Sequence, residues 1–241
     1  MRLHIFQHEA SCGPATLLEW TASRGIELNW VRFDEGATVP PLAEVEALVI
    51  LGGSMNAYQD EQFPHLASVR AFTREALLAG KKVFGICLGA QIMADALGSR
   101  VVRAPIPEKG WVEISRHSEA SQSPLFDWLP ENYRFISWHG DTFAMPASAI
   151  HGATSANCSA QAFVWGQNAL AVQFHPEADV PTIEGWINDE PEENQVFLRV
   201  QFLSDEALFE SQKRLFFQAL DAWWFHNQVP RTSISSSNSN T

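Results

Sequence analysis

Residues 82–91, Lys-Val-Phe-Gly-Ile-Cys-Leu-Gly-Ala-Gln, place an apolar segment directly before a Gly-x-Cys-x-Gly turn. The apolar part predicts a buried strand, and residues 88–97 predict the helix that follows it. Glycines 85 and 89 allow the chain to turn sharply, so the side chain of Cys87 projects from the carboxyl end of the strand. There the free N–H groups of the helix favour a thiolate, which attacks carbonyl carbon. The stretch therefore predicts a nucleophile elbow.

Predicted strands and helices alternate around this segment. Strands are expected near residues 2–7, 27–33, 46–51 and 82–86, and helices near 13–23 and 65–79. Such alternation is typical of a mostly parallel sheet with helices on both faces. Short extended runs then predict an antiparallel extension, at residues 101–103, 111–114, 133–136, 160–165 and 170–174. We therefore expect a flavodoxin-like α/β fold with a mostly parallel sheet and an antiparallel extension.

A candidate base and its orienting carboxylate follow the last of these runs, where the sequence is His-Pro-Glu. The period of two in a strand would place His175 and Glu177 on the same side, with Pro176 stiffening the backbone between them. Alone, Cys87 would be interpreted as a buried apolar cysteine and His175 as a core histidine. Together they predict a triad in which Cys87 attacks, His175 transfers the proton and Glu177 orients the ring.

Paired glycines at positions 52 and 53 end the predicted buried strand at residues 46–51. Because glycine has no Cβ, the backbone there can approach a substrate closely. The N–H of Gly53 is one candidate donor to the oxyanion of an acyl-transfer reaction, and the N–H of Leu88, directly after the nucleophile, is the other. These two N–H groups are the expected oxyanion hole.

Three ordered motifs, Gly-Gly at 52–53, Gly-Ile-Cys-Leu-Gly-Ala-Gln at 85–91 and His-Pro-Glu at 175–177, resemble those of the class I (triad-type) glutamine amidotransferases. The resemblance covers most of residues 1–180. The segment Trp-His-Gly-Asp at 138–141 is similar to the His-Gly-Asp segment of stand-alone proteins that resemble the glutaminase domain of GMP synthetase. This resemblance implies cleavage of the γ-amide of glutamine through a cysteine thioester.

The same resemblance implies substrate contacts. Gln91 would hold the γ-glutamyl head, and the backbone near Ser137 and Trp138 would hold the α-carboxylate. For His139 three hypotheses stay open, namely a second base, a substrate contact, and a turn stabilised by Asp141. One departure concerns the oxyanion hole: many family members have proline after the paired glycines, whereas this chain has Ser54. We therefore expect a mobile loop and a partly gated hole.

Composition and charge narrow the classes of partner. The chain has 241 residues, 46% of them hydrophobic, which is enough to bury a sizeable core. Its 28 acidic and 16 basic residues give a formal charge of −12, which argues against nucleic acid and anionic membranes as partners. Three widely spaced cysteines show no metal-ligand spacing, so no metal or cofactor is expected. The odd cysteine count, the absence of a signal peptide and the lack of an apolar run of roughly 18 residues predict a cytoplasmic protein.

The expected domain organisation is one amidotransferase-like domain over residues 1–190, a helical extension of it over 191–230 and a disordered tail over 231–241. Residues 189–194 are expected to form a solvated loop, and residues 205–227 a long helix. The aromatic residues of that helix, at 216–217 and 223–225, indicate docking on its own domain, with a partner interface as the alternative.

Three hypotheses remain for the function. The first is an amidotransferase-like protein that hydrolyses glutamine and supplies ammonia to a synthetase on a separate chain, because the sequence has no Gly-x-x-x-x-Gly-Lys loop for ATP. The second is a free-standing hydrolase of γ-glutamyl peptides. The third is a binding or regulatory module that has kept the fold without turnover.

Overall fold

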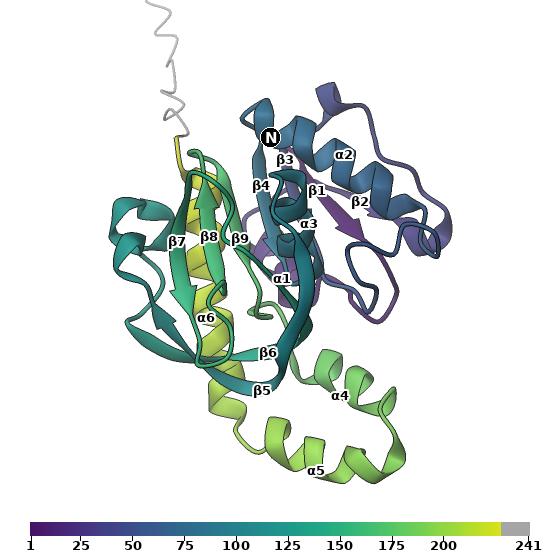
Figure 1. The fold of residues 1–241 in the computed structure, drawn as a ribbon, viewed down its shortest axis with the longest axis vertical. Coiled ribbons are helices and arrows are strands. Elements are labelled where there is room, and N and C mark those ends of the chain that lie inside the picture. Colours follow the sequence, from purple (N-terminus) through teal and green to yellow (C-terminus); the bar gives the residue numbers. More distant parts are fainter. Residues whose placement is uncertain (228–241) are drawn as a thin grey trace, which may run out of the picture.

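A single nine-stranded sheet organises residues 1–227, which are the residues described by the computed structural model (Figure 1). The strand order is β2-β1-β3-β4-β9-β8-β7-β5-β6. The strands are β1 (Leu3–Gln7), β2 (Leu28–Arg32), β3 (Ala47–Ile50), β4 (Lys82–Ile86), β5 (Val101–Arg116), β6 (Asn132–Phe143), β7 (Ala149–Thr154), β8 (Ala162–Trp165) and β9 (Ala169–Val172). The helices are α1 (Thr16–Ser23), α2 (His65–Leu78), α3 (Leu88–Ala96), α4 (Val180–Asn188), α5 (Glu192–Leu203) and α6 (Glu206–Phe225). Short 3₁₀ turns lie at Phe33–Glu35, Leu42–Glu44, Ser118–Gln122 and Pro124–Phe126.

Strands β2, β1, β3, β4 and β9 run parallel to one another. Every residue of β1, β3 and β9 is buried, as expected for strands covered on both faces. The predicted α/β fold with a mostly parallel half and an antiparallel extension is therefore confirmed. One assignment within it was wrong: the run at 170–174 forms β9, which pairs parallel with β4 and antiparallel only with β8. A short apolar run in the sequence does not indicate whether the strands beside it are parallel or antiparallel. The pairing of β9 with β4 was therefore not predictable from this run alone.

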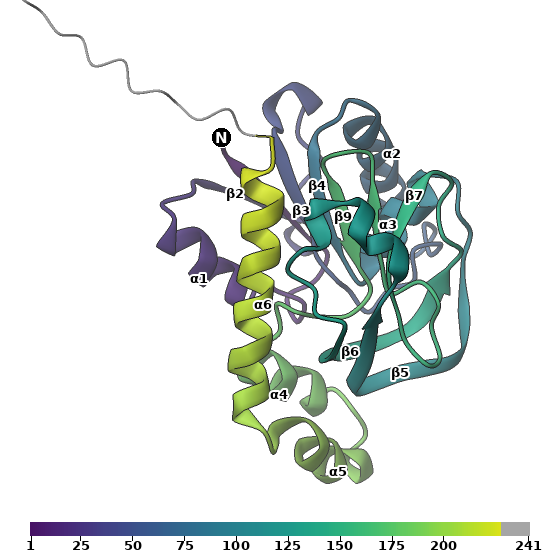
Figure 2. The same cartoon turned by 90° about the vertical axis from the view of Figure 1, so that its left-hand side faces the viewer.

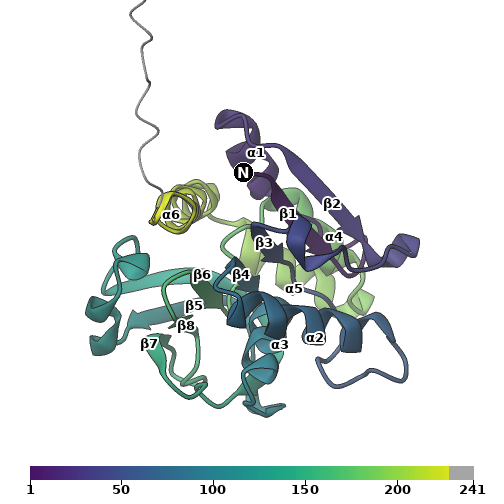
Figure 3. The ribbon, with the colours of Figure 1, turned by 90° about the horizontal axis from the view of Figure 1, so that it is seen from above.

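Helices cover both faces of the parallel half. Seen from above in Figure 3, α1 and α6 lie on one side of the strands and α2 and α3 on the other. Successive residues of β4 point to opposite layers, since Phe84 belongs to the core beneath α1 and α6 and Val83 to the core beneath α2 and α3. The ring of Phe84 lies 6.1 Å from that of Phe216 and 5.8 Å from that of Trp223. These contacts dock α6 on its own domain.

The antiparallel half consists of β5 to β8, and strands β5 and β6 form a long ribbon whose register shifts between Arg103 and Glu108. Arg103, before this bulge, and Glu108, after it, both line the site described below. The segment Ala149–Thr154, which carried no expected strand, forms β7.

Helices α4 and α5 lie together below the sheet (Figures 1 and 2). They share a small core with β6, formed by Ile136, Ile183, Leu198 and Phe202 among others. Asp179 is the N-cap of helix α4, because its carboxylate accepts a hydrogen bond from the backbone N–H of Thr182 at 3.0 Å. This N-cap was not predicted from the sequence. The expected loop at 189–194 is shorter than predicted, because α5 begins at Glu192. The expected tail at 231–241 lies outside the described residues.

Over residues 1–227, none of the helices is both long enough and apolar enough to cross a lipid bilayer.

Candidate active site

Cys87 occupies a strained backbone position between β4 and α3. Its φ of 51° and ψ of −107° are unusual for a residue with a side chain. The flanking glycines make the turn possible, because a Cβ on Gly89 would lie 2.1 Å from the carbonyl oxygen of Ile50, and a Cβ on Gly85 would lie 2.7 Å from the carbonyl carbon of Gly89. The thiol is buried at the amino end of α3. The predicted elbow geometry is present.

His175 and Glu177 lie in a turn beyond the end of β9, not within a strand. The expected side-by-side arrangement is present, but the turn at Pro176 creates it, and strand periodicity was the wrong reason. Nδ1 of His175 donates to Oε1 of Glu177 at 2.8 Å. Since a carboxylate only accepts, the proton lies on Nδ1 and leaves Nε2 for a second partner.

Contacts from three other elements hold this turn. The hydroxyl of Thr16 donates to the backbone carbonyl of Glu177 at 2.8 Å, and the N–H of His175 donates to the carbonyl of Ile136 at 2.7 Å. The ring of Trp186, from α4, meets the imidazole edge-to-face at 4.7 Å between centroids. The orientation of the base is therefore fixed by residues from β6, α4 and the start of α1.

The sulfur of Cys87 lies close enough to the imidazole of His175 to act on its charge. Gly52 lies beside both side chains, because a Cβ there would be 3.0 Å from Cε1 of His175 and 3.6 Å from Cβ of Cys87. Burial acts against a charged ring, but the carboxylate of Glu177 and the sulfur of Cys87 outweigh it and raise the pKa of His175 to about 10. This arrangement keeps the His175 ring protonated beside the sulfur at neutral pH.

Gln173 is a further neighbour of the sulfur that sequence reasoning missed. Its side-chain amide nitrogen lies 3.8 Å from Sγ of Cys87, and the residue is fully buried. An N–H donor at this position stabilises a thiolate more than a thiol. The detectable sequence feature was a single polar residue inside the apolar run at 169–174.

The two candidate oxyanion donors come from loops that pack against each other. A Cβ on Gly53 would lie 2.9 Å from Cδ2 of Leu88, so the paired-glycine loop touches the first residue of α3. The N–H of Leu88 has no acceptor within its own helix, because the first N–H groups of a helix never do. Both N–H groups thus belong to backbone adjoining Cys87.

A cavity of about 410 Å³ opens over the sulfur and the imidazole. Its lining includes Gln91, Trp138, His139 and Asp141, together with Arg103 and Lys109 of β5. The loop between α4 and α5 adds Asp189 and Glu190, and Glu190 pairs with Lys109. The amide of Gln91 donates to the carbonyl of Asp141 at 3.5 Å. Ser137 is fully buried and its side chain does not line the cavity, which leaves only its backbone for a substrate contact.

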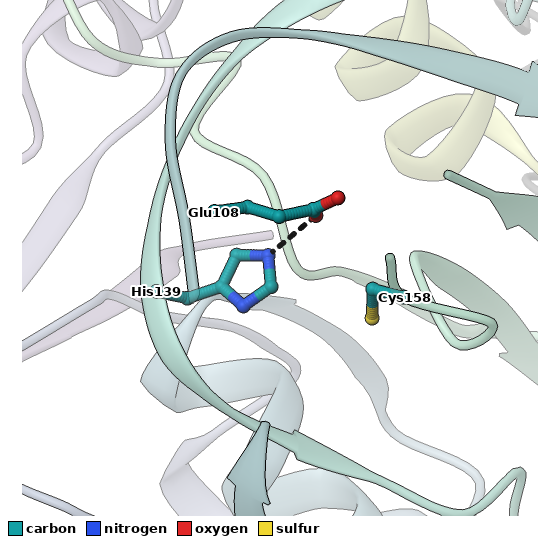
Figure 4. Close-up of side chains that lie close together, drawn as sticks. All are labelled: Glu108, His139 and Cys158. Carbon is teal, nitrogen blue, oxygen red and sulfur yellow. Dashed lines mark hydrogen bonds and ion pairs between the residues drawn. The ribbon is translucent and has the colours of Figure 1, made fainter. Parts of the chain in front are cut away.

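The ring of His139 has an acceptor at each nitrogen. Nδ1 lies 3.1 Å from the carbonyl oxygen of Asp141, and Nε2 lies 3.1 Å from the carboxylate of Glu108, the contact drawn in Figure 4. Both ring nitrogens are therefore engaged by protein partners, and neither is free to act as a second base. Of the three hypotheses, these contacts match the structural one, a turn stabilised by His139. The side chain that His139 contacts is that of Glu108, and the contact with Asp141 is through its backbone carbonyl.

Glu108, His139 and Cys158 form, among the residues that the structure describes, the one group with the composition and proximity of a metal site, their ligand atoms lying within 4.8 Å of one another. Burial acts to raise the pKa of Glu108, but hydrogen bonds from His139, Ser155 and Gln161 outweigh it and hold that pKa below its usual range. Because these three donors already satisfy the carboxylate, the cluster is explained as a buried hydrogen-bond network.

A buried cysteine in an elbow, an imidazole oriented by a carboxylate and two adjoining backbone N–H groups define a cysteine-dependent amide hydrolase on an α/β fold. The family model "Glutamine amidotransferase class-I" matches residues 15–185, and the chain belongs to that family. The predicted resemblance is thereby confirmed.

Individual relatives support the same assignment. The glutamine amidotransferase-like protein YfeJ of Salmonella typhimurium is 30% identical over 80% of this chain and 82% of its own length. One subunit of the glutamine-hydrolysing GMP synthase from Thermoplasma volcanium is 34% identical over 69% of this chain and 80% of its own length. A crystal structure of a glutamine amidotransferase from Thermotoga maritima superposes with a TM-score of 0.85 at 29% identity, covering 92% of this chain and 97% of the other.

Proposed function

We propose that this protein hydrolyses the γ-amide of glutamine through a thioester on Cys87 and supplies the released ammonia to a synthetase on a separate chain. The observation that carries the proposal is the position of Cys87 beside a buried imidazole that Glu177 orients at 2.8 Å, with Gly52 close to both. An amide hydrolase needs this combination, because the thiolate attacks and the imidazolium must protonate a poor leaving group.

In the first half-reaction the Cys87 thiolate attacks the γ-carbonyl carbon, and the carbonyl oxygen becomes an oxyanion that accepts hydrogen bonds from the N–H groups of Gly53 and Leu88. The C–N bond then breaks as the His175 imidazolium gives its Nε2 proton to the departing amine. The products are ammonia, a γ-glutamyl thioester and a neutral imidazole. Loss of the thiolate charge at this stage removes one of the causes that raise the pKa of His175.

In the second half-reaction a water molecule attacks the thioester while the neutral His175 removes its proton. The second oxyanion uses the same two N–H donors. Cleavage of the C–S bond releases glutamate and returns Cys87 as a thiolate beside a protonated His175. Glu177 stabilises the imidazolium that forms in this step and keeps the ring in the tautomer that presents Nε2.

The proposed substrate contacts use the wall of the cavity. Gln91 holds the γ-glutamyl head, and the backbone at Ser137 and Trp138 holds the α-carboxylate. Trp138 is supported for this role because its ring stacks on Phe202 at 5.1 Å, which fixes the strand backbone beside it. His139 contributes by holding β6 through its two ring hydrogen bonds.

Supply of ammonia to a partner is supported by two observations. The chain has no Gly-x-x-x-x-Gly-Lys loop to activate an acceptor with ATP. One of its relatives is named as a subunit of a glutamine-hydrolysing synthase. The cytoplasm is the proposed location, since three free thiols, including the nucleophile, fit a reducing compartment.

A second candidate function is hydrolysis of γ-glutamyl peptides without a partner. Two basic residues that line the cavity, Arg103 and Lys109, favour it, because they could bind the carboxylate of a peptide leaving group. Lys109 is already paired with Glu190 at 2.5 Å, so its charge is partly neutralised, and glutamine remains the favoured substrate.

The test is release of ammonia from glutamine by the purified chain, measured beside cleavage of γ-glutamyl peptides and beside a Cys87→Ser variant. Saturable ammonia release that Cys87→Ser abolishes and that a co-purified synthetase accelerates would support the proposal. Saturable peptide cleavage that exceeds glutamine turnover without any added protein would favour the second candidate. Failure of Cys87 to form an adduct with a glutamine-like electrophile would favour a module without turnover.

A further inference from the structure

Ser54 is held by one carboxylate at two points. Its backbone N–H donates to Oε1 of Glu9 at 2.5 Å, and its hydroxyl donates to Oε2 of the same residue at 2.7 Å. Ser54 is the residue that follows the paired glycines, at the position where proline was expected from the family resemblance. A proline would have no N–H for this contact, so the double hydrogen bond depends on the residue that is present here.

Glu9 is itself held by hydrogen bonds from neighbouring side chains. It lies just after β1, where its backbone carbonyl accepts the side-chain amide of Gln7 at 2.8 Å. The thiol of Cys12 donates to Oε1 of Glu9 at 3.3 Å. Burial, with the Glu9 carboxylate beside it, raises the pKa of Cys12, which keeps that sulfur protonated as a donor. The carboxylate therefore accepts three donors and lies at a defined place on the cavity wall.

Gly52 and Gly53 lie between two anchored positions of the backbone, Leu51 and Ser54. On one side, the N–H of Leu51 donates to the carbonyl of Phe6 at 3.0 Å, which anchors the end of β3. On the other side, the Ser54 N–H is held by Glu9, and the planar peptide then fixes the carbonyl of Gly53 as well. Gly52 and Gly53 would otherwise rotate freely, because neither has a Cβ. Anchoring both ends restricts the direction of the Gly53 N–H.

We propose that Glu9 is a positioning residue that holds residues 52–54, the oxyanion loop, with the Gly53 N–H directed at the developing oxyanion. The proposal rests on the proposed function, because the loop matters only if an acyl transfer takes place at Cys87. The sequence predicted a partly gated oxyanion hole, because Ser54 replaces the proline of many family members. The proposal differs: the hole is formed in the isolated chain, because the Glu9 carboxylate provides the rigidity that proline provides in those members.

Glu9 also faces the cavity, so a direct contact with the substrate's ammonium group is the competing explanation. The two roles affect different constants. A substrate ligand lost from the ground state raises KM, whereas a misdirected oxyanion donor lowers kcat, because the oxyanion exists only in the transition state and the intermediates.

The experiment measures kcat and KM for glutamine in Glu9→Ala, Glu9→Gln and Ser54→Ala, with Glu61→Ala as an exposed acidic control outside the cavity. Removing one oxyanion donor outright lowers kcat by roughly 10²–10³-fold, so Glu9→Ala, which leaves the donor present but unrestrained, is expected to lower kcat about tenfold or more with KM within about threefold. Glu9→Gln keeps one acceptor oxygen and should retain more activity than Glu9→Ala. Ser54→Ala loses only the hydroxyl contact and should lose less.

A second measurement separates positioning from general damage. Alkylation of Cys87 by iodoacetamide, followed by peptide mass mapping, needs the thiolate but forms no oxyanion, so its rate should be the same in wild type and all four variants. Should Glu9→Ala fold poorly, Glu9→Gln and Ser54→Ala carry the test with the same expectations.

Unchanged kcat in Glu9→Ala would overturn the positioning role of Glu9. A large rise in KM at constant kcat would also overturn it, because Glu9 would then be a substrate ligand. Wild-type protein that turns over neither glutamine nor a γ-glutamyl peptide would instead overturn the proposed function, so the two failures are distinct.

Discussion

The side-chain amide of Gln173 lies 3.8 Å from the sulfur of Cys87, and the Gln173 side chain is fully buried. The pair joins the end of β9 to the elbow after β4, two neighbouring parallel strands. This hydrogen bond to the sulfur comes from outside the Cys-His-Glu set, and an N–H donor there stabilises a thiolate more than a thiol.

Replacement of Gln173 by Leu is expected to slow alkylation of Cys87 by iodoacetamide at pH 7 by about tenfold, because a hydrogen bond to a charged group contributes roughly 1.5–3 kcal/mol. Glutaminase kcat should fall in parallel. The exposed Gln167→Leu serves as the control. Equal alkylation rates in Gln173→Leu and wild type would show that the amide does not stabilise the thiolate.

Replacement of Glu177 by Gln is expected to lower kcat by roughly 10²–10⁴-fold, because the amide can present its N–H₂ to Nδ1 and select the wrong tautomer of His175. The change also removes one of the charges that raise the pKa of His175. Steady-state kinetics with glutamine check the rate, and a circular dichroism melt checks that the fold is retained. A loss of less than about threefold would mean that the contacts of Thr16 and Trp186 orient the ring without the carboxylate.

The raised pKa of His175 makes stability depend on pH in a definite direction. Between pH 6.5 and about 10 the ring is protonated in the folded state and neutral in the unfolded state, so the folded state binds the extra proton. Its contribution is complete below pH 6.5 and is lost as the pH rises through about 10. Urea unfolding of wild type and His175→Gln at several pH values should show a stability difference that shrinks with rising pH, by at most about 1.4 kcal/mol per unit. A difference that grows with pH would contradict the assignment.

Gly89→Ala is expected to destabilise the protein by more than about 3 kcal/mol and to abolish activity, because its Cβ would lie 2.1 Å from the carbonyl oxygen of Ile50. The matched control is Gly185→Ala in α4, where a Cβ meets nothing within 4 Å. That exchange should stabilise the protein by about 0.5–1 kcal/mol, since alanine favours a helix. Chemical denaturation measures both. A mild effect at Gly89 would show that the elbow can relax.

Glu108→Ala is expected to cost about 3–5 kcal/mol of stability, because it breaks the buried pair with His139 and leaves Ser155 and Gln161 without the carboxylate that they share. Cys158→Ala removes the third member of the same cluster and should cost much less, since its sulfur makes a hydrogen bond with the neutral hydroxyl of Thr142 and none with Glu108 or His139. Guanidinium unfolding compares the two. Equal, large losses in both variants, together with stabilisation by added zinc of the wild type alone, would reveal a metal site in place of the hydrogen-bond network.

Much of this fold was predictable, because its determinants are local. The apolar run at 82–86 and the glycines around Cys87 specify a strand, a sharp turn and a helix within one short segment. Tertiary packing supplied the rest. The direction of β9 depends on β4 and β8, which are its neighbours only in the folded chain. The existence of β7 likewise depends on pairing with β5 and β8.

The candidate site divides in the same way. The sequence by itself determined the chemical types and their order, a cysteine in an elbow followed by His-Pro-Glu, since the glycines around Cys87 and the proline between His175 and Glu177 restrict the backbone locally. Only the tertiary structure decided that Gln173 reaches the sulfur, that Glu108 pairs with His139 and that Glu9 holds Ser54. Those contacts join residues 31 to 86 positions apart, and no local preference of the chain encodes which distant polar groups will be buried against each other.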